Sequence, residues 1–530
     1  MIMREKSSMK YGVFVAVLFV IFGGLFGCSQ VEVNSQDITS QIETNNESET
    51  SKEPPNIIFI LADDIGYSDL SINGQSNFST PNLDALANEG INFTNFYSGS
   101  AVCAPSRSVL LTGLHSGRTP VRANFMTIPS VDVNGKPTFK SKSFDDETVL
   151  VSEVLQDAGY TTGIVGKWGL GEIDDSGHPN KQGFDYFFGY LNHVHAHNHF
   201  TDFLWRNSER VELNNVTTSV DCSYCFKFGF DGTVTDIEQR NEYADDRLHV
   251  EALQFIERHA NDESPFFLFY SLISPHANNE ADKVDWAHGM EIPNYGEFDD
   301  ELWPDTAKGY AAMVANVDSY VGDIKNKLTS LGLSENTIVI FSGDNGPHAE
   351  GGNDPEFHNS NGSQRGIKRD LYEGGIRMPT IAWGPGTVPA GVVSDHIAYF
   401  GDVFATFTEL AQTEFEGELD SLSFAPTLLG ENNQANHDYL YWEFHLHGSS
   451  QAVRQGKWKA IRLPLMTGPI ELYDLDSDPW ETTDVAADHP ALVESFDKIM
   501  SDNHFPHPYW PVSKSDMSPD RKSQQHQIAN

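Results

Sequence analysis

The stretch NIIFILADD, Asn56–Asp64, decides the fold of this chain. An apolar run ends there at two aspartates, and two later segments repeat the design: FFLFYSLISPH, Phe266–His276, and TIVIFSGDN, Thr337–Asn345. Short runs that are apolar at almost every position are typical of strands buried on both faces, as in parallel sheets covered by helices. The sequence therefore predicts an α/β domain with a large mixed, mostly parallel sheet flanked by helices.

Polar side chains follow two of these runs where the predicted strands end. In such sheets ligands lie beyond the carboxyl ends of the strands, so we expect Asp63, Asp64, Asp344 and Asn345 to converge at one edge. Carboxylate and amide oxygens favour Ca²⁺, with Mg²⁺ as the alternative, whereas Zn²⁺ prefers nitrogen or sulfur. One such pair alone would more simply be a turn or a helix cap, and the repetition after apolar runs favours a metal site.

The motif CAPSR, Cys103–Arg107, precedes the apolar run Val109–Leu111. This arrangement predicts the first turn of a helix, where proline is well placed. Free N–H groups at a helix start favour an anion, so a nucleophile at Cys103 would meet anionic esters. The alternative is a buried cysteine at a helix start with no chemical role.

Two lysines stand in glycine-flanked strings. GKWGLG, Gly166–Gly171, contains Lys167, and GIKRDLYEGGIRMP, Gly366–Pro379, contains Lys368. Each lysine alone would be a solvated surface charge. The sequence around each lysine therefore decides whether it indicates a functional site.

These strings, the CxPxR motif and the aspartates after the strands resemble the type I sulfatases, in which the cysteine is oxidised after synthesis to Cα-formylglycine. The resemblance covers most of residues 55–500. It implies an alkaline-phosphatase-like sandwich and a formylglycine at position 103 that a formylglycine-generating or anaerobic maturation enzyme makes. It also implies a calcium ion held by Asp63, Asp64, Cys103 in its converted form, Asp344 and Asn345.

The resemblance implies a mechanism as well. A hydroxyl of the hydrated formylglycine attacks sulfur with Asp344 as base, while Arg107 and the metal hold the hydrate. Lys167 and Lys368 grip the sulfate ester and neutralise oxygens that gain charge as the S–O bond breaks. His276, with Lys368, serves the leaving oxygen as acid, since histidine titrates near neutral pH without perturbation.

Gly169 departs from the family pattern, because many sulfatases have there a histidine that takes a proton from the sulfated formylglycine. The nearest replacement lies in LNHVHAHNHF, Leu191–Phe200, where histidines alternate with other residues. On a strand these histidines would share one face. We therefore expect His195 or His197 to reach the active site and contact substrate, with a polar histidine-rich loop and a metal-binding tract as alternatives.

The chain begins like an exported bacterial protein. Residues 1–28 combine basic residues with a short apolar run that ends LFGC, which resembles a lipoprotein signal peptide cleaved before Cys28. We expect acylation of Cys28, palmitate included, and a lipid-anchored protein in the outer membrane or periplasm, with an ordinary secretory signal as the alternative. Residues 29–54 contain too little apolar surface to fold and predict a disordered tether.

Domain boundaries follow from changes in pattern. We expect a sulfatase-like catalytic domain over residues 55–412, a C-terminal subdomain over 413–512 and a polar tail over 513–530. Alternating segments and an amphipathic run predict a small antiparallel sheet with a helix in the subdomain, which resembles the C-terminal sheet of sulfatases. These segments are Tyr439–Phe444, Gln451–Ile461, Ile470–Leu475 and Pro490–Met500.

Two of the four cysteines remain after Cys28 and Cys103 have been given roles. Cys222 and Cys225 form a CxxC pair. In an exported protein this spacing favours a small local disulfide over half of a zinc site, because there is no second pair.

The charge balance excludes one class of partner. Lys plus Arg number 34 and Asp plus Glu 76, a net charge of −42, which rules out the sequence-independent attraction to nucleic acid that a basic surface provides. Repulsion of a sulfated polyanion is screened beyond roughly 8 to 10 Å at ordinary ionic strength, so cations inside a pocket can dominate locally. The acidic balance suits a marine setting.

The expected substrate is an extracellular sulfated polysaccharide or oligosaccharide, with a carrageenan-like galactan or ulvan favoured, and fucoidan and glycosaminoglycans left open. Aromatic residues within 184–205 are a candidate sugar platform, or simply core. Two other functions stay open. One is a phosphoester hydrolase of the same superfamily, and the other is a non-catalytic, glycan-binding surface lipoprotein in which Cys103 stays a thiol.

Overall fold

The computed structural model describes residues 53–510 and 512, except 125–127, 132–136, 141, 223–224, 226–231 and 446–448. The predicted signal peptide with Cys28, nearly all of the predicted tether and the polar tail lie outside the described residues. Among the described residues, no helix has the length and apolar composition needed to cross a bilayer.

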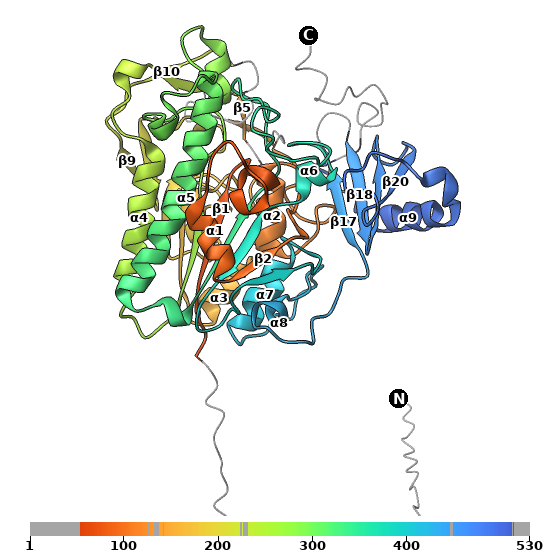
Figure 1. Cartoon of the computed structure of the whole chain (residues 1–530). Helices are drawn as coiled ribbons and strands as arrows, with labels where there is room; N and C mark the ends of the chain where they lie inside the picture. Colours follow the sequence, from red (N-terminus) through yellow and green to blue (C-terminus); the bar gives the residue numbers. More distant parts are fainter. Residues whose placement is uncertain are drawn as a thin grey trace, which may run out of the picture. The chain divides into compact units, whose positions relative to one another are not determined.

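A ten-stranded sheet forms the centre of the molecule (Figure 1). In spatial order its strands are β15 (Val392–Ser394), β2 (Ile91–Phe93), β14 (Thr380–Trp383), β13 (Thr337–Gly343), β1 (Asn56–Ala62), β12 (Phe266–Ser271), β6 (Thr161–Lys167), β7 (Tyr186–Tyr190), β8 (Phe203–Arg206) and β9 (Glu209–Glu212). The run from β13 to β7 is parallel, and β14 and β8 pair antiparallel at its two ends. The three apolar runs of the sequence are thus the adjacent strands β13, β1 and β12, which confirms the predicted sheet.

Helices cover both faces of this sheet. On one face α4 (Ala244–Arg258) and α5 (Asp305–Leu331) lie side by side, with α1 (Pro81–Asn88) against α5 (Figure 1). The other face carries α2 (Cys103–Thr112), α3 (Val151–Asp157) and α7 (Asp402–Leu410). Successive residues of β1 enter opposite layers, because strand side chains alternate: Ile58 shares a core with α4 and α5, and Phe59 shares one with α2 and α7. The predicted α/β sandwich is confirmed.

A second sheet follows toward the C-terminus. Its four antiparallel strands are β17 (Leu440–Phe444), β18 (Ser450–Gln455), β19 (Trp458–Arg462) and β20 (Ile470–Asp474). Helix α9 (Pro490–Asp502) packs Phe496 and Met500 into a core with Val453 and Leu472. The predicted small antiparallel sheet with a helix is therefore present, and the predicted segment Gln451–Ile461 is a hairpin of two strands.

Candidate active site

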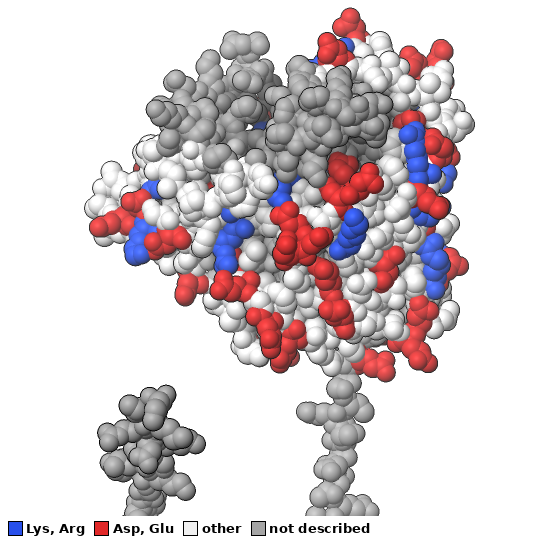
Figure 2. Space-filling model, turned by 180° about the vertical axis from the view of Figure 1, so that it is seen from behind, with Lys and Arg blue, Asp and Glu red and all other residues white. Residues whose placement is uncertain are grey.

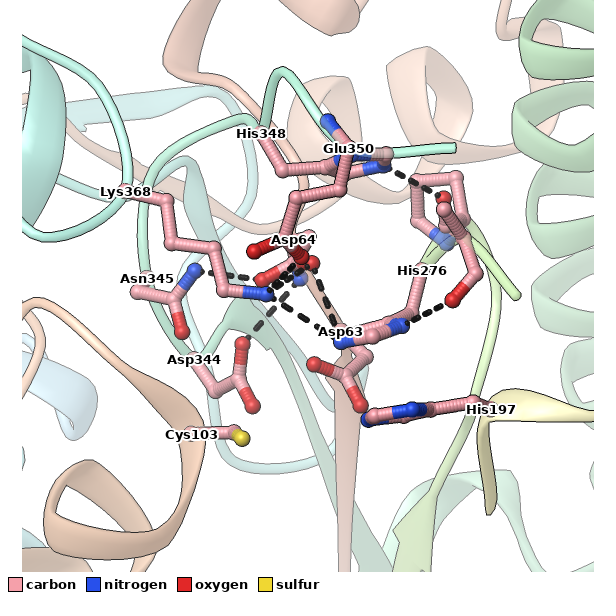
Figure 3. A network of polar contacts seen from close by, with 12 residues as sticks. Asp63, Asp64, Cys103, His197, His276, Asp344, Asn345, His348, Glu350 and Lys368 are labelled. Carbon is pink, nitrogen blue, oxygen red and sulfur yellow. Dashed lines mark hydrogen bonds and ion pairs between the residues drawn. The ribbon is translucent and has the colours of Figure 1, made fainter. Parts of the chain in front are cut away.

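The carboxyl ends of neighbouring parallel strands carry the predicted site residues at one edge of the sheet (Figure 3). β1 and β13 end in register, so Asp63 and Asp344 begin adjacent loops. Lys167 is the last residue of β6, and His276 lies in the loop after β12. Strand register, rather than sequence proximity, therefore assembles the site.

Cys103 is the first residue of α2, a helix that is buried along its whole length. Pro105 stands in its first turn, where a missing N–H costs nothing. The side-chain amide of Asn124 donates to the Cys103 sulfur at 3.2 Å, and the Lys167 ammonium lies 3.5 Å from it. Burial raises the pKa of the Cys103 thiol. An unmodified cysteine here therefore stays protonated and is a weak nucleophile.

Arg107, one turn further along α2, holds two carboxylates and a strand end. Its Nη2 lies 3.0 Å from Asp344 Oδ2 and 3.4 Å from Asp63 Oδ2, and its Nη1 donates to the Lys167 carbonyl at 2.6 Å. The planar guanidinium offers several donors in a fixed geometry. Arg107 therefore fixes the spacing of the aspartates at the ends of β1 and β13.

Each candidate lysine pairs with one aspartate. Lys167 Nζ lies 2.5 Å from Asp63 Oδ2, and Lys368 Nζ lies 2.7 Å from Asp64 Oδ2. All four side chains are buried, where a charge is costly unless it is paired. With the Arg107–Asp344 pair and the Arg369–Glu350 pair, which Lys368 also contacts, four cations face four carboxylates. The protein charges in this cluster thus balance before any ion or substrate is added.

His276 is neutral in this arrangement. Its Nδ1 lies 2.7 Å from the carbonyl oxygen of Ala277, so Nδ1 carries the proton and Nε2 accepts from Lys368 Nζ, 3.1 Å away. Burial and the positive charge of Lys368 lower the pKa of His276 well below its usual value. Lys368 also pairs with Glu350 at 2.8 Å. The proton of this pair is therefore held on Lys368, next to an imidazole that can receive it.

Two orphaned oxygens favour a cation at this edge. Asp63 Oδ1 and Asn345 Oδ1 are buried and accept no hydrogen bond from the described residues. Buried acceptors without a donor or a metal are costly and uncommon. Ligand atoms of Asp63, Cys103 and Asp344 lie within 4.8 Å of one another, and Asn345 is tied to Asp64 by a hydrogen bond of 2.7 Å.

The electrostatics of the cluster agree with that reading. Burial, followed by the negative charge of Asp63, raises the pKa of Asp344 to about 7. Crowded carboxylates gain from a divalent cation placed between them. Four of the five candidate ligands supply oxygen, which fits a hard cation such as Ca²⁺ or Mg²⁺.

The histidine tract is not a strand, contrary to the alternation in its sequence. Residues His195–His197 form a short 3₁₀ helix, so the side chains diverge. The ring of His195 packs against Tyr190 and Phe203, with centroids 4.8 and 4.3 Å away, and does not join the cluster. His197 does, because its ring stacks on His276 at 4.9 Å.

His193, which sequence reasoning did not select, lies beside Gly169. A Cβ placed at Gly169 would be 3.6 Å from the Cβ of His193. Burial lowers the pKa of His193 well below its usual value, and the charges of His197 and Lys167 act in the same direction. The Cβ of a histidine from another segment thus lies close to the point where a side chain at position 169 would begin. The only signal for it in the sequence was the tract itself.

Cys222 and Cys225 are joined by a disulfide, as their spacing favours. The sulfur of Cys225 lies 3.2 Å from Oε1 of Glu280, and Oε2 of Glu280 contacts Nδ1 of His197 at 2.9 Å. The disulfide therefore lies against the carboxylate that contacts His197.

Most aromatic residues within 184–205 belong to the core and do not form a sugar platform, and Tyr186 and Trp205 are half-buried. Phe187, Phe188 and Tyr190 are fully buried in β7, and Phe184 is 1% exposed. Their rings are inaccessible because β7 is an interior strand covered on both faces. Exposed aromatic surface for a sugar has to be sought elsewhere.

Comparisons with known proteins agree with the fold. Residues 55–413 match the family model Sulfatase, and residues 367–502 match N-sulphoglucosamine sulphohydrolase, C-terminal. N-acetylgalactosamine-6-sulfatase of Mus musculus is 33% identical over 413 residues, 77% of this chain and 72% of that protein. Arylsulfatase G of Homo sapiens is 31% identical over 502 residues, 86% and 87% of the two chains. The structure of Ps i-CgsB in complex with k-i-k-neocarrahexaose aligns with a TM-score of 0.67 and 26% identity, over 88% of this chain and 98% of that one.

The sandwich fold and the charged cluster at its edge define an ester hydrolase of the sulfatase type. The chain belongs to the sulfatase family, and its reaction is the hydrolysis of sulfuric esters. This family generally uses a formylglycine and a divalent metal, and the acidic groups described above could hold one.

Proposed function

We propose that the protein removes sulfate from an extracellular sulfated glycan, with a formylglycine made from Cys103 and a bound Ca²⁺. One observation carries the proposal: the buried start of α2 places Cys103 beside Lys167, at the same edge as the orphaned oxygens of Asp63 and Asn345. A set of ligands dominated by oxygen, without a histidine pair, favours one hard cation over the two transition metals of a phosphoester hydrolase.

The site residues fall into two groups: those that would bind the metal ion and those that transfer protons. Asp63, Asp64, Asp344 and Asn345 would hold the metal with residue 103. When present, the formylglycine supplies a hydrated aldehyde as nucleophile, and the metal supplies positive charge to a sulfate oxygen. Because the cations already balance the carboxylates in number, a divalent ion leaves the pocket positive and suited to an anionic ester.

Proton transfer on the leaving-group side belongs to Lys368 and His276. The contact of 3.1 Å between Nζ and Nε2 holds a proton that the departing alcohol oxygen can take. Lys167, on the other side of the cluster, neutralises charge near position 103. His193 is the proposed proton acceptor beside Gly169, in the place of the side chain that the glycine lacks.

The proposed substrate is a sulfated galactan of the carrageenan type, with ulvan and glycosaminoglycans as the other classes to test. Support comes from the likeness to Ps i-CgsB, a structure that contains neocarrahexaose. We further propose that the protein is exported and lipid-anchored at Cys28 in the bacterial cell envelope, which rests on the N-terminal sequence. Partners would then be the glycan, a maturation enzyme and the membrane that holds the lipid.

The deciding experiment is peptide mass spectrometry across residue 103, on protein produced with a formylglycine-generating enzyme, followed by sulfate release from carrageenan, ulvan and chondroitin sulfate. We expect an aldehyde at 103 and sulfate release from one of these glycans, and neither from Cys103→Ala. A retained thiol without turnover under these conditions would favour the glycan-binding lipoprotein.

Metal identity has a separate test. Chelation should lower the melting temperature, because an ion that binds only the folded state stabilises it. We expect added Ca²⁺ to restore the melting temperature at lower concentration than Mg²⁺. Restoration by Mg²⁺ alone would change the assigned metal and leave the nucleophile unaffected.

A further inference from the structure

A hollow of about 480 Å³ lies outside the cluster of charged residues, and we propose that it binds an acidic sugar unit of the glycan, next to the unit whose sulfate is cleaved. Its lining includes Ile237, Arg240, Trp286, His288 and Tyr295. The inference rests on the proposed function and extends it to a second contact with the same polymer.

Backbone hydrogen bonds connect this hollow to the candidate active site. The N–H of Gly289 donates to the Gly351 carbonyl at 2.8 Å, and the Gly289 carbonyl accepts from the N–H of Asn278 at 2.8 Å. A Cβ at position 289 would lie 2.6 Å from both neighbouring backbones, so only glycine allows this approach. Asn278 follows His276 by two residues, and Gly351 follows Glu350. The segment that lines the hollow therefore passes, at Gly289, close to the loops that carry His276 and Glu350.

Arg240 is a charged side chain in the lining of the hollow. Its Nη2 lies 2.7 Å from Oε1 of the buried Glu291, and its Nε donates to the Thr235 carbonyl at 3.0 Å. Within the described part of the chain its Nη1 makes no hydrogen bond. A guanidinium with unused donors suits a sulfate or carboxylate group. Such a cation is notable in a chain of net charge −42.

Exposed apolar surface supplies the rest of the hollow. Trp286 is 51% exposed and Ile237 is 77% exposed, although large apolar side chains usually lie inside. The flat face of an indole matches the C–H face of a sugar ring. A hydrogen bond of 3.1 Å between His288 Nε2 and the Tyr295 hydroxyl ties two further rings together. The hollow thus places apolar and aromatic side chains beside the Arg240 guanidinium, and the carboxylate of Asp299 also lines it.

Size favours a small ligand over a protein partner. Pockets for small molecules span about 300 to 1,000 Å³ and combine aromatic side chains with a few polar groups, as this hollow does. A stable protein interface needs about 800 Å² from each partner. Continuity with the site and the remaining donors of the Arg240 guanidinium therefore point to the next sugar of an acidic chain.

The test measures binding to the Cys103→Ala protein, which has no nucleophile and leaves the ligand intact. The probes are neocarrahexaose and the same hexasaccharide after desulfation. We expect Trp286→Ala to raise the Kd of the sulfated probe about tenfold or more. Arg240→Lys should reduce the preference for the sulfated probe, because lysine lacks the planar fork. The matched control is Trp480→Ala, a tryptophan that is 42% exposed and outside the hollow, which should leave the Kd unchanged.

Several outcomes would overturn the proposal. One is an equal Kd for the Trp286 and Trp480 variants. Another is the lack of binding by carrageenan, ulvan and chondroitin sulfate hexasaccharides alike. A third is a concentration-dependent dimer that Trp286→Ala abolishes, since it would assign this surface to self-association.

Turnover measurements distinguish a failure of the proposed sugar site from a failure of the proposed sulfatase mechanism. In the matured enzyme, Trp286→Ala should lower the ratio of kcat/KM on the hexasaccharide to kcat/KM on 4-nitrophenyl sulfate about tenfold. Binding that depends on Trp286 in a protein that releases no sulfate would refute the sulfatase mechanism at residue 103 and keep the sugar site. Sulfate release with an unchanged ratio of the two kcat/KM values in Trp286→Ala would keep the sulfatase mechanism and refute the sugar site.

Discussion

His193, the proposed proton acceptor beside Gly169, can be tested by substitution. We expect His193→Ala to lower kcat on a sulfate ester about 10²- to 10⁴-fold, the usual contribution of one proton-transfer group. Added imidazole should restore part of the rate, because the lost side chain leaves a space beside Gly169. Steady-state kinetics with and without imidazole measure both effects.

His195→Ala is the matched control from the same tract. Its ring packs between Tyr190 and Phe203, so its loss should lower the melting temperature with little change in the kcat of the folded enzyme. Similar losses of kcat in both variants, without rescue by imidazole in either, would show that the tract is structural.

Asp69 links stability to pH. Its buried Oδ2 accepts hydrogen bonds from the Gly66 N–H and the Tyr310 hydroxyl, and burial raises the pKa of the carboxyl to about 7. In an unfolded chain this pKa is about 3.9. Between these two values the folded state keeps a proton that the unfolded state has lost, so the contribution of Asp69 to stability falls as pH rises from about 4 to 7.

Asp69→Asn should remove this dependence while it keeps an oxygen acceptor for both donors. We expect the melting temperature of the variant, relative to the natural protein, to rise between pH 4 and pH 7. The underlying change is at most about 4 kcal/mol. A difference that is the same at both pH values would contradict the raised pKa.

At the scale of elements, α6 (Glu373–Ile376) joins the catalytic part to the C-terminal sheet through a buried charge cluster. Lys459 of β19 lies 2.8 Å from Glu373 and 3.0 Å from Glu481. All three side chains are at most 2% exposed. Burial and the charge of Glu373 raise the pKa of Glu481 to about 7, against the opposing effect of Lys459. The Lys459 ammonium thus contacts both carboxylates, and Arg377 lies 3.9 Å from Glu373.

Lys459→Met should therefore destabilise the fold by about 3 to 5 kcal/mol, the cost of a buried charge that loses its partner. Lys498→Met is the control, because Lys498 is 74% exposed and pairs with Asp502 within α9. Such an exposed pair contributes about 0.3 to 0.5 kcal/mol. Denaturant unfolding measures both variants, and a loss at Lys459 as small as that at Lys498 would mean that the cluster does not join the two sheets.

The central strands were predictable from sequence because each carries a long apolar run. The strands β15, β2 and β14, which follow one another at one end of the sheet, have only three or four residues and leave no such signal. The histidine tract was wrongly predicted as a strand for a different reason, because its contacts are with residues far away in the sequence. His197 contacts Glu280 and His199 contacts Asp245, residues 83 and 46 positions away. The alternation of histidines with other residues over ten positions contains no information about these contacts.

The same limit applies to the site. Cys103 and Lys368 stand in recognisable strings, so sequence alone could propose them. Glu350 and His193 were missed, because only the tertiary fold brings Glu350 within 2.8 Å of Lys368 and His193 beside Gly169. Residues in family strings were accessible from sequence, and residues that act through tertiary contact were not.

At the scale of the whole molecule, acidic side chains dominate. Figure 2 shows Asp and Glu spread over one face among fewer basic residues. The net charge of −42 repels a sulfated polymer at long range. The cations of the site act differently, because Lys167 and Lys368 are buried and screened little by salt.

The long-range repulsion and the short-range contacts of the site together predict how catalysis depends on salt concentration. The screening length shortens from about 30 Å at 0.01 M to about 8 Å at 0.15 M, which weakens the long-range repulsion and leaves contacts of a few ångströms intact. We therefore expect kcat/KM on polymeric carrageenan to rise over this range, and kcat/KM on 4-nitrophenyl sulfate, with its single charge, to change less. Initial rates on both substrates across the range give the comparison. A steady fall of kcat/KM on the polymer would mean that the cations of the site control encounter at long range, despite the acidic surface.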